Sequence, residues 1–226
     1  MLCSGMAPPL SILLDLDGTV VDSRPGILAS CQAALRALGH RPDGLDLDGL
    51  IGPPLEEVLA VVLAGYGDDR VGEAALAYRE HYGTAGFRET AVYPGLPAAL
   101  DDLLALDATL YIATSKRRVF AERILDHLGL IDRFAGVHGS EADGTFDRKA
   151  DLVAHVLDRH GLGPGRCLMV GDRRHDAEGA RANGVATVGV LWGYGDRAEL
   201  EAAGVLHIVA EPPELVSIVS GLRAAS

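Results

Sequence analysis

The stretch SILLDLDGT, residues 11–19, decides the fold. Its first four residues read as a buried strand, because continuous apolar character is typical of a parallel strand covered on both faces. Two aspartates at positions i and i+2, Asp15 and Asp17, follow before a glycine turn. A bare carboxylate beside these leucines is costly to bury without a partner. The pair therefore indicates a hard-cation site at a strand end, with a solvated turn as the alternative.

Apolar runs like the first one recur along the chain. We predict six strands: Ser11–Leu16, Ala108–Ala113, Ala135–Gly139, Cys167–Val170, Ala186–Leu191 and Leu206–Ala210. Helical patterns that end at glycine or asparagine lie between them, at Val119–Leu128, Ala150–His160 and Asp176–Ala182. Repeated strand–helix units imply an α/β fold, a Rossmann-like doubly wound parallel sheet.

The segment from Ser23 to Tyr93 breaks this rhythm. It shows no convincing buried strand and predicts helices at Ile27–Leu38, Leu55–Leu63 and Val71–Tyr82. A Pro-Gly pair at 94–95 then marks the return to the α/β pattern. We therefore expect a core of residues 1–22 and 94–226 with a small helical cap domain inserted at 23–93.

Composition limits the possible partners. The 226 residues carry 20 basic and 32 acidic side chains, a formal charge of −12, so binding to nucleic acid is not expected. No apolar run approaches the ~20 residues of a membrane span, and residues 1–10 do not resemble a signal peptide. The three cysteines form no CxxC pair. We expect a cytoplasmic protein without a membrane partner.

A second pair of acids, Asp172 and Asp176, follows another predicted strand directly after Gly171. Asp176 could simply cap the next helix, but Asp172 has no such local role. Ligands of open α/β sheets bind at the carboxyl ends of the strands, where Asp15 and Asp172 are both expected. Acids that converge there repel each other unless a cation is present.

Two further elements suggest phosphate binding. Thr114 and Ser115 follow a strand, where a hydroxyl and backbone N–H groups at a helix start can cradle a phosphate; plain helix capping is the alternative. Lys149, one of only two lysines with Lys116, opens a predicted helix. A cation is unfavourable there unless an anion is nearby, and a surface position is the alternative.

Along the chain, four motifs resemble in order those of the haloacid dehalogenase (HAD) superfamily of phosphatases: Asp15-x-Asp17-Gly18-Thr19, Thr114, Lys149 and Gly171-Asp172-x-x-x-Asp176. The segments IGPPL (51–55), YPG (93–95) and WGYG (192–195) are further similar to its phosphoglycolate-phosphatase-like subgroup. The insert matches the helical C1-type cap of that family in position. The resemblance implies a Mg²⁺-dependent phosphomonoester hydrolase, a monomer or homodimer, acting on a small phosphorylated metabolite. Phosphoglycolate, a nucleoside monophosphate and a sugar phosphate all remain open as the substrate, with the first two favoured.

The resemblance also implies catalytic roles. Asp15 is the nucleophile that forms an aspartyl-phosphate. Asp17 protonates the leaving oxygen and then activates water. Thr114 and Lys149 hold the phosphoryl oxygens. Phosphoryl transfer needs such positioning and charge neutralisation more than it needs unusual chemistry.

Metal and substrate ligands are implied in the same way. Asp15, the backbone carbonyl of Asp17, and Asp172 would hold Mg²⁺, while Asp176 would support the metal site or orient Lys149. The expected substrate-binding residues are Gly18, Thr19, Ser115 and, on the cap side, Arg24, Pro53 and Pro54.

Other functions stay open or are disfavoured. Sugar-phosphate mutases share all four motifs and remain an alternative. A non-catalytic binding module on this fold is expected to carry a damaged motif, and none is damaged. The segment GYGDRA at 193–198 mimics a dinucleotide fingerprint. Since only one further strand follows it, we interpret the segment as a loop.

Overall fold

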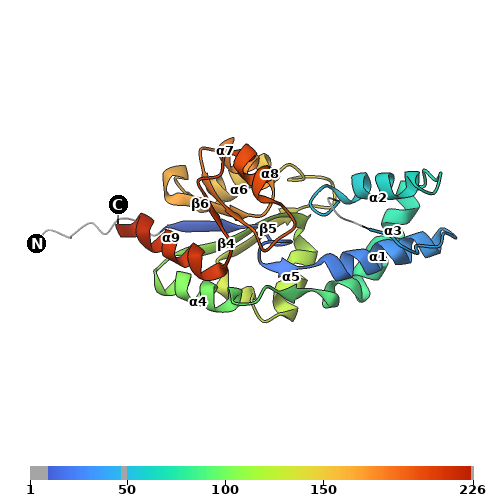
Figure 1. Ribbon diagram of the computed structural model, residues 1–226, viewed down its shortest axis with the longest axis horizontal. Helices are drawn as coiled ribbons and strands as arrows, with labels where there is room; N and C mark the ends of the chain where they lie inside the picture. Colours follow the sequence, from blue (N-terminus) through green and yellow to red (C-terminus); the bar gives the residue numbers. More distant parts are fainter. Residues whose placement is uncertain (1–9, 47–49, 225–226) are drawn as a thin grey trace, which may run out of the picture.

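The computed structural model describes residues 10–46 and 50–224, which fold around a six-stranded sheet (Figure 1). The strands are β1 (Ser11–Leu14), β4 (Thr109–Arg117), β5 (Gly136–Ser140), β6 (Cys167–Gly171), β7 (Ala186–Val190) and β8 (His207–Val209). Their order is β5-β4-β1-β6-β7-β8, and every pairing is parallel. All six predicted strands and the fold class are confirmed, with β1 near the centre.

Helices cover both faces of this sheet. Alternate residues of β1 divide between two cores. Ile12 and Leu14 pack in the core that contains Leu100, whereas Leu13 packs in the core that contains Val153. The first face carries α4 (Leu96–Ala105), α5 (Arg118–His127) and α9 (Pro212–Ala224), and the second carries α6 (Lys149–His160) and α7 (Arg174–Arg181), beside α8 (Arg197–Ala203). Short 3₁₀ turns lie at Gly86–Glu89, Ile131–Arg133 and Pro164–Arg166.

The inserted segment forms the three predicted helices. They are α1 (Arg24–Ala37), α2 (Leu55–Ala64) and α3 (Val71–Thr84), and α3 packs against the other two at one end of the molecule (Figure 1). The chain leaves and re-enters the sheet region through a two-stranded antiparallel ribbon, β2 (Val21–Asp22) and β3 (Ala91–Val92). The predicted limits 22/23 and 93/94 lie beside this ribbon, and the two-domain division stays a prediction.

None of the described helices combines the length and apolar character needed to cross a membrane. Cys31 and Cys167 are buried free thiols. The cytoplasmic location, the oligomeric state and the expected partners stay predictions.

Candidate active site

The two acids of the first motif diverge from the end of β1. The backbone of Asp15 still belongs to the sheet edge, because its N–H donates to the carbonyl of Val170 at 3.0 Å. The chain then turns through Gly18, whose φ is +83°. A Cβ on Gly18 would overlap the carboxylate of Asp172, so only glycine allows this approach. The turn thereby lies directly against Asp172, which follows the neighbouring strand β6.

Lys149 lies at the centre of the core side of the site. Its Nζ is 2.9 Å from Asp15 Oδ1 and 2.8 Å from Asp176 Oδ1, and it donates to the carbonyl of Ala113 at 2.9 Å. The side chain is buried. Burial lowers the pKa of Lys149, but the Asp15 and Asp176 carboxylates raise it above its ordinary value, so the ammonium stays charged. The predicted anion beside Lys149 is therefore confirmed.

Three carboxylates form a cluster suited to a cation. Asp15, Asp172 and Asp176 each offer one oxygen within 4.8 Å of the others. Asp172 is fully buried, and its Oδ2 accepts from the Tyr194 backbone N–H at 2.7 Å. Its Oδ1 is buried without a hydrogen-bond partner among the described residues. Burial and the charges of Asp176 and Asp15 raise the pKa of Asp172 to about 8.

This donor set fits Mg²⁺, a hard cation that binds carboxylate oxygens. The unpartnered Oδ1 of Asp172 supports the fit, because a buried polar atom without a partner is costly. The expected meeting of Asp15 and Asp172 is confirmed. The side chain of Asp17 lies outside this described cluster, and the backbone carbonyl of Asp17 as a metal ligand stays a prediction.

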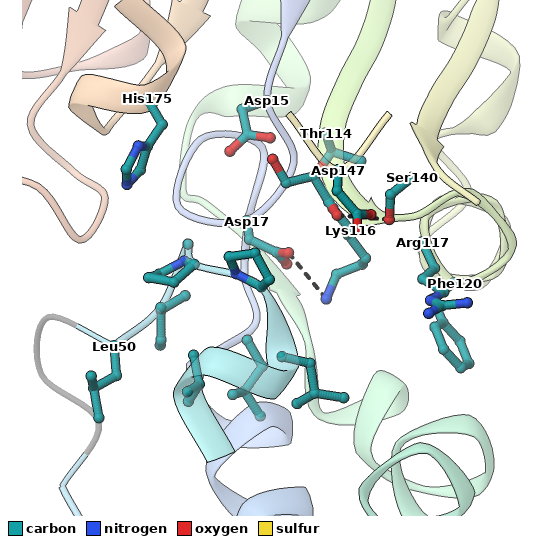
Figure 2. Close-up of a pocket in the computed structure, with 18 of the residues that line it drawn as sticks. Asp15, Asp17, Leu50, Thr114, Lys116, Arg117, Phe120, Ser140, Asp147 and His175 are labelled. Carbon is teal, nitrogen blue, oxygen red and sulfur yellow. Dashed lines mark hydrogen bonds and ion pairs between the residues drawn. The ribbon is translucent and has the colours of Figure 1, made fainter. Parts of the chain in front are cut away.

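Asp17 instead pairs with the second lysine of the chain. Lys116 Nζ is 3.0 Å from Asp17 Oδ2 (Figure 2) and donates to the hydroxyl of Tyr82 at 3.0 Å. The same ammonium lies 4.6 Å from the centre of the Tyr82 ring. Tyr82 belongs to α3, so Lys116 joins the first motif to the inserted helices. Sequence analysis does not assign this role, although the scarcity of lysine was a usable signal.

Thr114 lies in a different local structure from the one predicted. It sits inside β4, which continues to Arg117, and α5 begins only at Arg118. The register between β4 and β5 shifts between Thr114 and Arg117, so an irregularity continues the strand where a helix start was expected. The expected helix start at Thr114 and Ser115 is therefore wrong, whereas their role in phosphate binding stays a prediction. The Thr114 hydroxyl accepts instead from the Lys116 N–H at 3.2 Å.

One pocket brings these groups together (Figure 2). The core lines it with Asp15, Asp17, Thr114, Ser115, Lys116, Lys149 and Asp176, and the inserted segment lines it with Pro53, Pro54, Tyr78 and Tyr82. Gly18, Thr19 and Arg24 lie outside this lining. Thr19 is fully buried, and the guanidinium of Arg24 lies over the ring of Tyr194, 5.2 Å from its centre.

An aromatic wall of the pocket was not predicted. The rings of Tyr78 and Tyr82 are stacked with centroids 5.5 Å apart, and Phe120 meets Tyr82 edge-on at 5.4 Å. All three line the pocket. In the sequence, Tyr78 and Tyr82 are indistinguishable from the apolar face of any helix, because only tertiary packing shows what that face meets.

Known proteins resemble this chain over most of its length. The family model described as haloacid dehalogenase-like hydrolase matches residues 12–190. A 5'-nucleotidase of Pseudomonas aeruginosa is 44% identical over 202 residues, which are 89% of this chain and 91% of that protein. The tyrosine-protein kinase PtkA of Mycobacterium tuberculosis is 40% identical over 192 residues, 84% of this chain but 65% of that protein.

The predicted subgroup and fold also have close counterparts. A phosphoglycolate phosphatase of Neisseria gonorrhoeae is 31% identical over 193 residues, covering 82% of this chain and 81% of that protein. The crystal structure of a predicted phosphatase from Clostridium acetobutylicum shares 32% identity and superposes with a TM-score of 0.86, covering 95% of this chain and 100% of the other. The chain therefore belongs to the haloacid dehalogenase-like hydrolase family.

Proposed function

We propose that this phosphatase hydrolyses monoesters of small organic phosphates with Mg²⁺, through an aspartyl-phosphate on Asp15. The observation that carries the proposal is the convergence of nucleophile, acid and cations at one pocket. Asp15, Asp17, Thr114 and Lys149 all line it. A carboxylate oxygen of Asp172 lies within 4.8 Å of one of Asp15, so that one cation could contact both. Every motif is intact, which disfavours a non-catalytic binding module.

Asp15 attacks phosphorus in the first step, and the ester oxygen leaves. A carboxylate nucleophile divides the hydrolysis into two easier displacements. Lys149, already 2.9 Å from Asp15 Oδ1, supplies positive charge for the phosphoryl oxygens. The hydroxyl of Thr114 provides a further donor on the same side of the pocket. Together they position and neutralise the transferring group.

Asp17 handles the protons of both steps. It gives its own carboxyl proton to the leaving oxygen, and the resulting carboxylate then takes a proton from the water that attacks the aspartyl-phosphate, which restores the acid. Its carboxylate is held at the boundary with the inserted helices by Lys116 Nζ, on the side from which the organic part of the substrate would enter.

Mg²⁺ would be held by Asp15, Asp172 and the backbone carbonyl of Asp17, with Asp176 supporting the site while it orients Lys149. The ion supplies charge neutralisation for the transferring phosphoryl group. The chain provides the preformed acidic cluster, in which Asp172 already receives a backbone hydrogen bond from Tyr194.

Nucleoside monophosphates are the substrate class that we favour. Tyr78 and Tyr82 of the aromatic wall are buried, so the half-buried ring of Phe120 is the part of the wall that can contact a base or sugar, which phosphoglycolate lacks. The relative that is 44% identical is a 5'-nucleotidase. Phosphoglycolate is the second choice, supported by the more distant phosphoglycolate phosphatase.

The test is a panel of phosphate esters, including p-nitrophenyl phosphate, with wild-type protein and Asp15→Asn. We expect the variant to lose at least ~10³-fold in turnover with an unchanged circular dichroism spectrum, and exposed Asp43→Asn to behave as wild type. EDTA should stop the reaction and Mg²⁺ should restore it. Full activity of Asp15→Asn removes the nucleophile, and indifference to chelation removes the metal. Isomerised sugar phosphate in place of free phosphate identifies a mutase.

A further inference from the structure

We propose that Tyr194 links the cation site to the connection between the sheet and the inserted helices. This connection, which we call the hinge, is the β2–β3 ribbon with the start of α1. A cation at Asp172 would fix the hinge in the arrangement described above. The proposal rests on the proposed function, because it takes the acidic cluster as the Mg²⁺ site. It assigns a positioning role to the WGYG segment, which the catalytic mechanism does not otherwise use.

The loop that carries Tyr194 lies directly on Asp172. The Tyr194 N–H donates to Asp172 Oδ2 at 2.7 Å. A Cβ on Gly193 would overlap the Asp172 side chain and the carbonyl of Gly18, and a Cβ on Gly195 would overlap the carbonyl of Asp172. The two glycines of this apparent dinucleotide fingerprint therefore allow the loop backbone to approach the acid closely.

The other end of Tyr194 reaches the first hinge strand. Its hydroxyl accepts from the N–H groups of Ser23 at 2.9 Å and Arg24 at 3.1 Å, and it donates to Asp22 Oδ1 at 3.0 Å. A phenolic hydroxyl has one proton and two acceptor lone pairs, so these three contacts can form together, and Ser23 Oγ also lies 3.4 Å from the same hydroxyl. The three residues are consecutive and join β2 to α1. Tyr194 thus fixes the chain where it enters the inserted helices.

The strand by which the chain returns from the inserted helices, β3, is bonded to the outgoing strand, β2. Asp22 pairs with Ala91 in the β2–β3 ribbon, and the Tyr93 N–H donates to the carbonyl of Val20 at 3.3 Å. Holding Asp22 to Arg24 therefore also holds the return strand. The neighbouring Trp192 adds a third contact, since its Nε1 donates to the carbonyl of Thr19 at 3.0 Å.

A cation bound by Asp172 Oδ1 would fix the carboxylate whose Oδ2 holds Tyr194. Movement of the hinge away from the Tyr194 hydroxyl would then strain a loop that is anchored on the metal ligand. Coupling of this kind is reciprocal. The hinge arrangement should strengthen cation binding by the same factor by which the cation stabilises the hinge.

The test compares wild type, Tyr194→Phe and Tyr66→Phe by amide hydrogen exchange and Mg²⁺ calorimetry on the full chain. Tyr66→Phe is the matched control, because its hydroxyl donates to the carbonyl of Arg41 within the inserted helices. In wild type and Tyr66→Phe, Mg²⁺ should slow exchange at Ser23 by ~10-fold. In Tyr194→Phe this slowing should disappear, and the Kd for Mg²⁺ should rise by about 5-fold.

The outcomes separate this link from the proposed function. Mg²⁺ that binds wild type but leaves exchange at Ser23 unchanged overturns the link and leaves the phosphatase proposal standing. A wild-type protein that binds no Mg²⁺ overturns both. Should Tyr194→Phe fail to fold, Asp22→Ala removes the oxygen that accepts from the tyrosine hydroxyl and from the Arg24 N–H. It should show the same two effects at smaller size, and wild-type behaviour of this variant overturns the link.

Discussion

The two lysines of this chain serve opposite walls of the pocket and balance charge differently. On the core wall, Lys149 pairs with two members of a three-acid cluster, Asp15 and Asp176. On the wall that faces the inserted helices, Lys116 meets one acid, Asp17, and the neutral hydroxyl of Tyr82. With all acids ionised, the group of Lys149 and its three-acid cluster carries two uncompensated negative charges, whereas the pair of Lys116 and Asp17 carries none.

This difference separates the metal site from the link between core and cap. Two like charges within the 4.8 Å of the acidic cluster repel by roughly 3 kcal/mol at an effective dielectric constant of ~20. A divalent cation removes that cost, so the acidic cluster of the core wall favours binding of such an ion. The balanced pair of Lys116 and Asp17 needs no added ion. It can instead hold a core acid against a residue of α3.

Breaking the core wall should have the largest effect. Lys149→Met removes the cation that neutralises the nucleophile and the phosphoryl oxygens, so we expect kcat to fall by ~10³-fold or more. The loss of a positive charge beside Asp15 should leave Mg²⁺ binding as tight or tighter. Steady-state kinetics and calorimetry measure the two effects. Arg159→Met, an exposed cation on the same helix, is the control, and a variant retaining a tenth of wild-type activity would contradict the role of Lys149.

The pH dependence of stability, with and without Mg²⁺, tests the acidic cluster of the core wall. In the metal-free protein the pKa of Asp172 is raised to about 8 from its ordinary 3.8 by burial and by Asp176 and Asp15. The folded state therefore holds a proton that the unfolded state releases, and the free energy of unfolding falls as pH rises from about 4 to about 8. Mg²⁺ favours the ionised form, so its stabilising effect should grow across this window.

Urea unfolding at about pH 5 and about pH 8, with and without Mg²⁺, measures this growth. We expect the Mg²⁺-dependent gain in unfolding free energy to be roughly 2–4 kcal/mol larger at the higher pH. Asp172→Asn should remove the difference, because the amide does not titrate. An equal gain at both pH values would contradict the assignment of Asp172 as a metal ligand.

Asp15 and Asp172 of the core wall could be predicted from sequence because each follows an apolar run that predicts a strand. Apolar runs predict parallel strands, and parallel strands bring their carboxyl ends to one edge, so Asp15 and Asp172 had to meet. Failures occurred where local signals were ambiguous. Helices α4 and α9 were not predicted, and both carry proline in the first turn, where proline fits a helix start. The strand irregularity after Thr114 has no clear sequence signature.

The opposite wall could not be predicted for a different reason. Lys116 and Tyr82 are 34 residues apart and belong to β4 and α3, and only the packing of the inserted helices over the core brings them together. The same holds for Tyr194, which is 171 residues from Ser23. Its glycine-rich segment mimics a dinucleotide fingerprint, although we interpret it as a loop, because glycine allows close backbone approach in both settings.

Breaking that opposite wall should have a smaller effect than breaking the core wall. Lys116→Met removes the only described cation paired with Asp17 and leaves the Tyr82 hydroxyl without its donor. Asp17 is then less well held for its two proton transfers, and we expect kcat to fall by about 10-fold. Mg²⁺ affinity should stay unchanged, because Lys116 serves the balanced wall. Kinetics and calorimetry on one preparation test both halves of the expectation.

Tyr82→Phe separates the two partners of Lys116. This variant keeps the ring beneath the ammonium and the Asp17 ion pair but removes the hydroxyl that ties Lys116 to α3. If the main task of Lys116 is to hold Asp17, the loss in kcat should be about 2-fold, and Tyr66→Phe should show none. A loss as large as that of Lys116→Met would instead indicate that the main task of Lys116 is its contact with α3. The division between a metal-binding wall and a wall that joins core to cap would then rest on Tyr82 as much as on the lysine.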